Sequence, residues 1–377
     1  MATKNSNTRK SGASASGTKK RLTKKERQAR QKKRMILFGV EAVLIVVLAV
    51  ILFLVTKVDK MEATDIDESE IAFNEGIGNS DGESGEVPEA MKGYRNIALF
   101  GVDSRNGALG KGTLSDTILV ASINEDTKEV RLISVFRDTY LNLGNDTYNK
   151  ANNAYSKGGP KQAINMLNMN LDLNITDYVT VGFQGVVDTV DALGGVEIDV
   201  DEAEISHLNN YQIGTAEAIG RKNQYTKVTT TGMQTLDGLQ ATSYCRIRYT
   251  AGDDFKRAER QREVIAAIAQ KVKNASASQV NDIANKVFSQ TATSLELSEI
   301  LELLTDVQGY TIVASDGFPF EDMRATGTVG RKGSCVMPVD LEANVVKLHK
   351  FLFDVDNYEP SDSVKEYSAK IHQDTGK

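Results

Sequence analysis

The segment NIALFGVDSRNGALGKGTLSDTILVASINEDTKEVRLISVFRDTYL (residues 96–141) contains three short apolar runs separated by polar residues. The first run, NIALFGVD (96–103), has the composition of a buried strand that ends in polar residues. DTILVASIN (116–124) and EVRLISVFRDTYL (129–141) are two further strands, and the short turn EDTK between them predicts that they pair. A buried sheet whose strands end in polar residues is therefore the expected centre of the fold.

Helices and strands continue to alternate after this segment. Apolar residues recur at helical spacing in KQAINMLNMNL (161–171), QGVVDTVDALGG (184–195) and DFKRAERQREVIAAIAQKVKNA (254–275). Strand character is found in DYVTVGF (177–183), VEIDV (196–200) and GYTIVAS (309–315), and QTLDGLQATSYCRIRY (234–249) is typical of a short helix that enters a strand. The alternation predicts a three-layer α/β domain with a central mixed sheet.

An apolar run, MILFGVEAVLIVVLAVILFLV (35–55), is long enough to cross the roughly 30 Å hydrocarbon core of a bilayer as a helix. The preceding residues 1–34 carry 13 Lys or Arg and a single acid, in a chain of net charge −6. Because positive flanks stay cytoplasmic, we expect a single-pass cell-membrane protein with its C-terminal domain outside. A cleaved signal peptide is the main alternative, but its apolar region would be shorter and would end at a small-residue cleavage site.

Composition divides the rest of the chain. We expect residues 1–34 to be a basic cytoplasmic tail that rests on anionic lipid head groups, with no nucleic acid as a partner. Residues 56–93 are acidic and contain Gly and Ser, which predicts a flexible, solvated stalk. A folded extracytoplasmic domain is expected over 94–355, and a C-terminal tail over 356–377.

The cysteines and histidines indicate little metal chemistry of their own. Cys245 and Cys335 form no CxxC pattern, and the three histidines are scattered, which argues against a zinc site built on histidine. The two cysteines are too few for a disulfide framework. A single disulfide between them stays open, and so does the alternative that Cys245 is a small buried apolar residue.

Charged residues gather beside the predicted strand ends and on one predicted helix. Asp103 and Asp116 could hold a divalent metal ion through carboxylate oxygens. Arginines that could hold phosphate oxygens by paired hydrogen bonds accompany them: Arg105 and Arg137 beside strand ends, Arg246 and Arg248 two apart on one strand face, and Arg257 with Arg260 and Gln261 on the helix 254–275. The alternative is a set of ordinary surface salt bridges. Two arginines side by side on a strand, however, repel unless an anion or acids neutralise them.

The motifs NIALFGVDSR, LSDTILVASIN, VRLISVFRDTYL, NKANNAYSKGGP, YVTVGFQGVVDTVDALGGVEIDV and YCRIRYTAGDDFKRAERQREVI occur in that order between Asn96 and Ile265. In sequence and spacing this stretch resembles the LytR-CpsA-Psr family of cell-wall glycopolymer ligases. The resemblance covers nearly half of the chain strongly and residues 94–355 more loosely. A basic tail, one membrane helix and an external body are also the layout of that family.

The resemblance implies a role for each matching residue. Asp103 and Asp116 correspond to the acids that bind Mg²⁺, or Mn²⁺ in its place. Arg137, Arg246 and Arg248 correspond to phosphate-binding arginines, and further head-group contacts are expected from Arg105, Lys150, Asn152, Arg257 and Gln261. The residues expected to act on the reacting group are Asp103, as the base, with Arg137 and Arg248.

Three positions depart from the family pattern. Phe136 stands where proline is usual before Arg137, and this change is expected to affect the stiffness of the loop rather than the role of the arginine. Arg262 stands where a second glutamine is common, which adds charge near the expected head-group site. Ala151 is smaller than the usual Leu or Ile. None of the three removes a side chain to which the resemblance gives a role.

The activity implied is phosphotransfer. The donor would be a teichoic acid or capsular polysaccharide linked to undecaprenyl pyrophosphate. The acceptor would be a hydroxyl of peptidoglycan, expected to be the C6 hydroxyl of N-acetylmuramic acid, and undecaprenyl phosphate would be released. A polyprenyl-pyrophosphate hydrolase and a non-catalytic lipid-binding regulator of the envelope are the alternatives. An apolar slot for the prenyl chain is required, but the sequence does not locate it.

Overall fold

The computed structural model describes residues 62–63, 66, 68–78, 87–103, 108–250 and 252–377. All of them belong to one compact unit, Val55–Lys377. The predicted basic tail and membrane segment, residues 1–55, lie outside the described residues. Within the described part of the chain, no helix combines the length and the apolar character needed to cross a bilayer.

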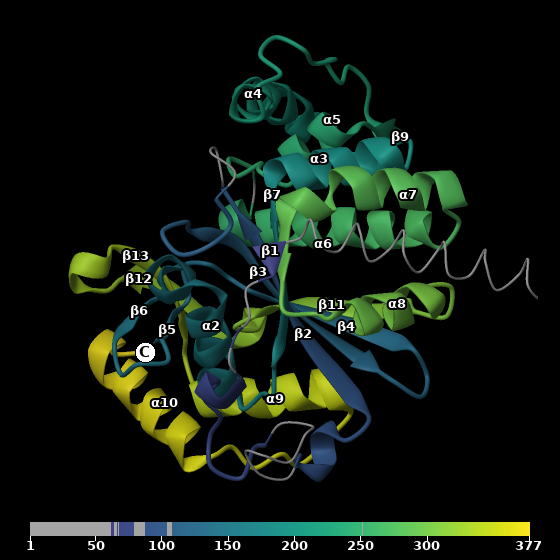
Figure 1. Ribbon diagram of the computed structural model, residues 1–377. Coiled ribbons are helices and arrows are strands. Elements are labelled where there is room, and N and C mark those ends of the chain that lie inside the picture. The colour runs from purple at the N-terminus through teal and green to yellow at the C-terminus, as the bar shows by residue number, and fades with distance from the viewer. Residues whose placement is uncertain (1–61, 64–65, 67, 79–86, 104–107, 251) are drawn as a thin grey trace, which may run out of the picture. The chain divides into compact units, whose positions relative to one another are not determined.

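A seven-stranded mixed sheet forms the centre of this unit (Figure 1). The strands of the predicted pair are antiparallel neighbours, although the second one ends at Val135 rather than at Leu141. The first strand pairs antiparallel with the second and, on its other side, parallel with the strand at 177–182, and both edges of the sheet are parallel pairs. In sheet order the strands are β1 (Glu62–Ala63), β10 (Thr291–Thr293), β7 (Asp177–Gly182), β2 (Tyr94–Val102), β3 (Ser115–Asn124), β4 (Glu129–Val135) and β11 (Thr311–Phe318).

Helices cover both faces of the sheet, as the sequence predicts (Figure 1). One face carries α2 (Asn152–Leu171), α9 (Leu341–Phe353) and α10 (Asp362–Thr375). The other face carries α6 (Asp253–Val272) and α8 (Leu297–Thr305). Helix α2 begins earlier than the predicted 161, because Gly159 adopts a positive φ of 69° at a kink and two helical segments join there.

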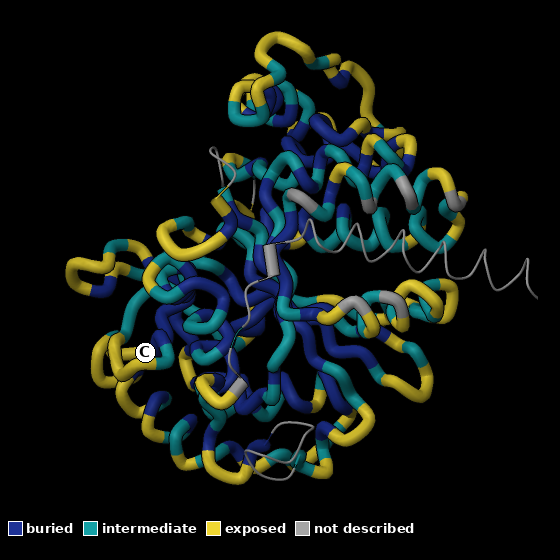
Figure 2. The backbone as a smooth tube through the Cα atoms, in the orientation of Figure 1, coloured by how far each residue is buried: buried dark blue, intermediate teal, exposed yellow. Residues whose placement is uncertain are grey.

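The two faces of β2 belong to two different apolar cores. Ala98 and Phe100 pack with α2 and α9, whereas Ile97 packs with Ile265 of α6 and Leu303 of α8. Successive side chains of a strand point to opposite faces, which gives this alternation. Figure 2 shows the central strands in the colour of buried residues, as expected for a sheet covered on both sides.

A third core lies beyond α6. It joins α3 (Phe183–Ala192), α4 (Glu202–Ala218), α5 (Gly238–Tyr244) and the hairpin of β8 (Val196–Val200) and β9 (Gly232–Leu236), and α7 (Ala277–Lys286) packs against α3. Helices α3 and α5 approach closely, because a Cβ at Gly238 would lie 2.1 Å from the carbonyl oxygen of Val187.

Short elements complete the chain. Two small hairpins are β5 (Tyr140–Asn142) with β6 (Tyr148–Lys150), and β12 (Arg324–Thr328) with β13 (Ser334–Pro338). The 3-10 turns are η1 (Glu68–Glu70), η2 (Glu89–Met91), η3 (Phe288–Gln290), η4 (Glu321–Met323) and η5 (Gly330–Lys332).

The predicted stalk and the predicted C-terminal tail both pack on the domain where they are described. Ile71, Ile77 and Met91 lie in the core of α2 and α9, so this part of 56–93 is no solvated stalk. Residues 356–377 contain α10, whose Val364 and Ile371 are buried in the same core. Both interpretations were wrong for these residues, because a few well-placed apolar side chains outweigh a polar average composition.

The strand predicted at the end of 234–249 is also absent. Helix α5 ends at Tyr244, and residues 245–250 form a turn in which the backbone N–H of Arg246 donates to the carbonyl of Ser243. Ile247 is fully buried in the third core, and it anchors this turn between Arg246 and Arg248. The two arginines therefore owe their placement to a buried residue between them rather than to a strand.

Candidate functional site

A cavity of about 390 Å³ lies on the α6 face of the sheet. The ends of β2, β3 and β7 form one wall, and α3, the end of α5 and α6 form the other. Such a volume falls within the range of about 300–1,000 Å³ that is usual for small-molecule sites.

The deep part of the cavity is apolar. Aliphatic side chains from β2, β3, β7, α3 and α6 line it: Leu99, Leu119, Val179, Val181, Val186, Val264, Ile265 and Ile268. Several of them are only half-buried although they lie between a sheet and its covering helices, because they face the cavity instead of a packed neighbour. The cavity thus has the form of the apolar slot that the sequence left unlocated.

Charged side chains line the same cavity where the strands end. They are the predicted residues Asp103, Asp116, Arg246, Arg248 and Arg257, with Gln261 beside them. The two aspartates come together because β2 and β3 are neighbours and Val102 lies opposite Ser115, one residue before each acid. A polar group at one end and a hydrocarbon wall at the other suit an amphiphilic ligand.

Arg137 lies at the edge of this charged group. It donates from Nη1 to Oδ1 of Asp116 at 2.6 Å, and its side chain is 15% exposed. Burial lowers the pKa of Arg137, but the carboxylates of Asp116, Asp254 and Asp138 together raise it more, so the pKa lies above its ordinary value. This ion pair keeps the Arg137 guanidinium charged beside Asp103 and Asp116, the two candidate metal ligands.

Asp254 gathers three of the site arginines. Its carboxylate accepts from Arg248 Nε at 3.1 Å and pairs with Arg257 Nη1 at 3.2 Å, and Arg137 Nη2 lies 3.9 Å away. Asp254 stands in the first turn of α6, where a carboxylate also interacts favourably with the helix dipole. It holds the guanidiniums in one cluster and offsets part of their repulsion.

Arg257 is the most enclosed of these charges. Its side chain is 6% exposed, and among the described residues its Nε–H has no hydrogen-bond acceptor. Burial and the neighbouring charge of Arg137 lower the pKa of Arg257, although an arginine remains protonated at neutral pH. A buried guanidinium with an unused donor at a cavity wall is a feature that an anionic ligand would satisfy.

Aromatic rings orient Arg246. Its guanidinium lies 4.6 Å from the ring centroid of Phe183 and 5.6 Å from that of Tyr211, and Nη1 donates to Thr215 Oγ1 at 2.8 Å. Stacking of this kind fixes the planar group without neutralising its charge.

The remaining predicted residues lie elsewhere. Lys150 and Asn152 do not line the cavity: Lys150 Nζ pairs with Asp138 at 2.9 Å, and the backbone N–H of Asn152 donates to the carbonyl of Arg137. Both residues support the Arg137 loop. Arg105 lies outside the described residues.

Two arginines of helix α6 point away from the cavity. Arg260 is 1% exposed and pairs with the buried Glu204 at 2.7 Å, so it is a structural ion pair and not a phosphate ligand. Arg262 donates to Ser134 Oγ at 2.9 Å and does not line the cavity, so it adds no charge at the expected head-group site.

Sequence reasoning missed Asp254 and the rings of Phe183 and Tyr211. The spacing of Asp254 three residues before Arg257 is the signal that could have found the first, because residues i and i+3 of a helix are neighbours. No local pattern marks the two rings, since they come from α3 and α4 and meet Arg246 only in the fold.

A magnesium ion fits the residues present. The donors that Asp103 and Asp116 offer are carboxylate oxygens, and Mg²⁺ commonly uses one or two carboxylates together with substrate phosphates. Among the described residues no group of three or more His, Cys, Asp or Glu side chains forms a complete metal site. The ion would therefore depend on the substrate for further ligands.

Both thiols are free, so the disulfide that the sequence left open is not formed. Cys245 lines the cavity, and burial raises its pKa to about 12, which keeps the thiol protonated at neutral pH.

We expect the denatured protein to take up two alkyl groups from iodoacetamide without any reductant, and the native protein to react slowly. Mass spectrometry checks both results. Alkylation that requires prior reduction would contradict the free-thiol state.

Comparisons with known proteins give matches both in sequence and in fold. A model of the LytR_cpsA_psr family matches residues 49–342. The polyisoprenyl-teichoic acid–peptidoglycan teichoic acid transferase TagU of Enterococcus faecalis is 32% identical over 214 residues, which are 56% of this chain and 65% of that protein. In three curated relatives, of which this TagU is one, the matched region spans 60–65% of the relative's own length, which is just under two thirds.

Solved structures share the fold. The crystal structure of Bacillus subtilis TagV is 25% identical with a TM-score of 0.55, and the match covers 71% of this chain and 99% of the crystallised TagV chain. A structure of TagT bound to LI-WTA is 20% identical with a TM-score of 0.53, and the match covers 80% of this chain and all of the TagT chain in that structure. At 20% identity the second likeness shows the fold alone.

Proposed function

Because the chain belongs to the LytR_cpsA_psr family, we propose that it transfers a glycopolymer from a polyprenyl-pyrophosphate lipid to peptidoglycan. The polymer would be an anionic one, a teichoic acid or a capsular polysaccharide, and the first of these is in line with the names of the relatives. The matched region covers less than two thirds of those relatives. The support for this activity therefore comes from the residues of the site.

One observation supports the proposal most strongly: a single cavity contains both an apolar slot and a cluster of charged side chains. Leu99, Val179 and Ile268 form hydrocarbon walls, and Asp103, Arg248 and other charged residues line the same space. A polyprenyl pyrophosphate has the matching division, with a long hydrocarbon chain and two linked phosphates. A wholly polar or a wholly apolar ligand would leave one part of the cavity unsatisfied.

The acidic side chains around the phosphate site nearly balance the arginines in charge, which favours binding of a metal ion together with the substrate. The described acids are Asp103, Asp116, Asp138 and Asp254, and the described arginines are Arg137, Arg246, Arg248 and Arg257. A pyrophosphate would bring further negative charge into this nearly neutral cluster. Mg²⁺ held by Asp103 and Asp116, or Mn²⁺ in its place, would neutralise that charge and polarise the phosphate oxygens.

The side chains would divide the work of transfer. The acceptor hydroxyl attacks the sugar-side phosphorus, a new P–O bond forms, and the bond to the outgoing polyprenyl phosphate breaks with its electron pair. Asp103 takes the hydroxyl proton, and Arg137 and Arg248 stabilise the negative charge that builds on the leaving phosphate. Asp254 keeps both arginines in place between turnovers.

Blocking the slot tests lipid recognition separately from phosphate recognition. Val179 lines the cavity from β7, so Val179→Phe should fill it. We expect affinity for a long-chain polyprenyl pyrophosphate to fall at least about tenfold, roughly 1.4 kcal/mol. Affinity for geranyl pyrophosphate, whose chain is short, should change much less.

The matched control for the blocking variant is Val313→Phe, at a residue that is 46% exposed on β11 and remote from the lining. Titration of both lipids into the parent and the two variants, with thermal melts to check folding, gives the comparison. Equal loss of affinity for long and short chains would place the prenyl chain elsewhere.

We also propose that residues 35–55 anchor the protein in the cell membrane, with the N-terminus in the cytoplasm and the domain outside. The basic flank before the apolar run supports this orientation. It would place the cavity on the side of the membrane where peptidoglycan is found, with the bilayer as the source of the lipid-linked donor.

A further inference from the structure

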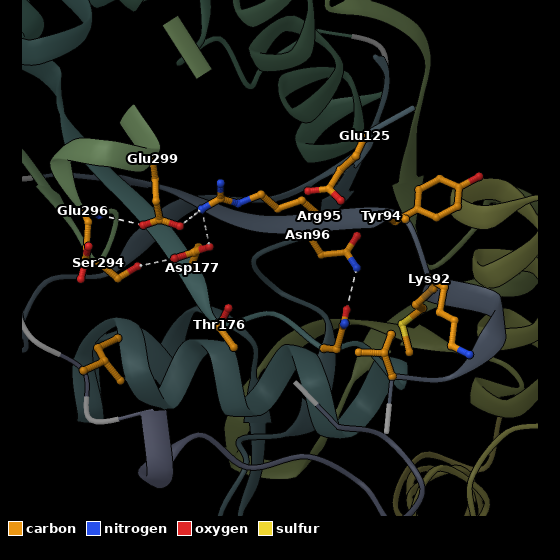
Figure 3. Close-up of a pocket in the computed structure, with 15 residues that line it drawn as sticks. Lys92, Tyr94, Arg95, Asn96, Glu125, Thr176, Asp177, Ser294, Glu296 and Glu299 are labelled. Atoms are coloured by element: carbon orange, nitrogen blue, oxygen red, sulfur yellow. Dashed lines mark hydrogen bonds and ion pairs between the residues drawn. The ribbon is translucent and has the colours of Figure 1, made fainter. Parts of the chain in front are cut away.

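A second cavity, of about 690 Å³, lies at the opposite end of strand β2 from Asp103 (Figure 3). Asn96 is one of its lining residues, and it stands seven residues before Asp103. At about 3.3 Å per residue of strand, the two sites are separated by roughly 23 Å. This cavity is therefore distinct from the candidate phosphate site.

The floor of the second cavity contains a buried amide with an unused acceptor. Asn96 is 4% exposed, and its Nδ2 donates to Asn174 Oδ1 at 2.8 Å. Among the described residues Asn96 Oδ1 has no hydrogen-bond partner. A buried carbonyl oxygen without a donor is unfavourable, so a ligand that supplies an O–H or N–H at this point would be bound well.

The charges of the cavity disfavour a phosphate. Arg95 Nη2 lies 2.9 Å from Asp177 Oδ2 and also pairs with Glu299, so one guanidinium is already matched by two carboxylates. Glu125 and Glu296 add two negative charges to the lining, and Lys92 adds one positive charge. An anionic polymer or a pyrophosphate would meet net repulsion here.

The rest of the lining combines small polar groups with an apolar side. Thr176 and Asn174 can both donate and accept hydrogen bonds, and the half-buried Ile66 and Val87 supply hydrocarbon surface. A sugar ring also combines polar and apolar surface, with hydroxyl or amide groups around its edge and C–H groups on its faces. A lipid would leave the amides unsatisfied, and an anion would be repelled.

We propose that this cavity is a binding site for uncharged saccharide units, distinct from the site of phosphoryl transfer. Asn96 Oδ1 accepts from a sugar hydroxyl or acetamido N–H, Asn174 and Thr176 bind neighbouring polar groups, and Val87 packs on the ring. The inference does not depend on the transfer reaction, since it rests on a different cavity. It gives the domain a second contact with a glycan chain.

The test uses the full chain in detergent, with an uncharged N-acetylglucosamine oligomer as the probe and polyglycerol phosphate as the anionic comparison. Thr176→Tyr places a larger side chain in the cavity without removing the Asn96–Asn174 pair. We expect oligosaccharide affinity, measured by calorimetry, to fall at least about tenfold. The matched control is Thr229→Tyr, at an exposed residue outside the lining, which should bind like the parent.

Two further readouts decide the proposal. Asn96→Ala should weaken oligosaccharide binding in a protein that melts like the parent, and Thr176→Tyr should leave polyprenyl-pyrophosphate binding unchanged. No measurable oligosaccharide binding by the parent, equal affinity in Thr176→Tyr, or tighter binding of polyglycerol phosphate at this cavity would each overturn the proposal. A failure of lipid binding in every variant would count against the transfer site alone.

Discussion

Asp116→Asn and Asp103→Asn are each expected to lower Mg²⁺-dependent transfer at least about 100-fold without unfolding the domain. Both acids line the charged part of the cavity, and both would have to hold the ion that lets a pyrophosphate enter a cluster of balanced charge. Asp116 also accepts from Arg137 at 2.6 Å, so its replacement weakens the contact that positions a guanidinium needed by the leaving phosphate. An amide keeps the shape of the side chain but supplies no negative charge.

The control for these variants is Asp126→Asn, in the exposed turn between β3 and β4. Initial rates measured across a range of Mg²⁺ concentrations, with thermal melts of all four proteins, give the result. Near-normal transfer by Asp103→Asn or Asp116→Asn at limiting Mg²⁺ would show that the acid in question is not a ligand.

Arg248→Ala should weaken binding of a polyprenyl pyrophosphate by about 100-fold while changing stability by less than about 1 kcal/mol. The side chain is 34% exposed, and its partner Asp254 keeps a second arginine, Arg257, at 3.2 Å. Its loss therefore leaves no uncompensated buried charge. Arg248→Lys should restore little affinity, because a point charge cannot make the two-pronged contact of a guanidinium.

Arg331→Ala, at an exposed arginine of η5, is the control for loss of a positive charge. Lipid titrations at two salt concentrations separate a specific contact from general attraction, which salt screens. Unaltered affinity in Arg248→Ala would mean that Arg248 is a surface salt-bridge partner of Asp254 and no phosphate ligand.

The sheet could be predicted from the sequence because its signals are local. The apolar runs at 96–103, 116–124 and 129–141 are long enough to fix three neighbouring strands, and the turn at 125–128 fixes the pairing of two of them. The segments 56–93 and 356–377 were harder, because their average composition is polar. Their packing depends on isolated residues such as Ile71 and Ile371, which meet the core only in three dimensions.

The site could be predicted in part for the same reason. Spacing and family resemblance identified Asp103, Asp116 and the arginine pair, and the structure places all four on one cavity. Spacing also grouped Arg260 with Arg257, yet a difference of three residues along α6 turns Arg260 toward Glu204 and away from the cavity. The apolar slot had no sequence signal, because its walls come from strands and helices far apart in the chain.

The measurement that tests the central claim most directly is a transfer assay with the full chain, a purified polyprenyl-pyrophosphate-linked glycopolymer and peptidoglycan. We expect Mg²⁺-dependent appearance of polymer joined to peptidoglycan by a phosphodiester, with polyprenyl phosphate formed in equal amount. Polyprenyl phosphate formed at the same rate without peptidoglycan, with the polymer left free, would identify a hydrolase. Tight lipid binding with no product of either kind would contradict catalysis altogether.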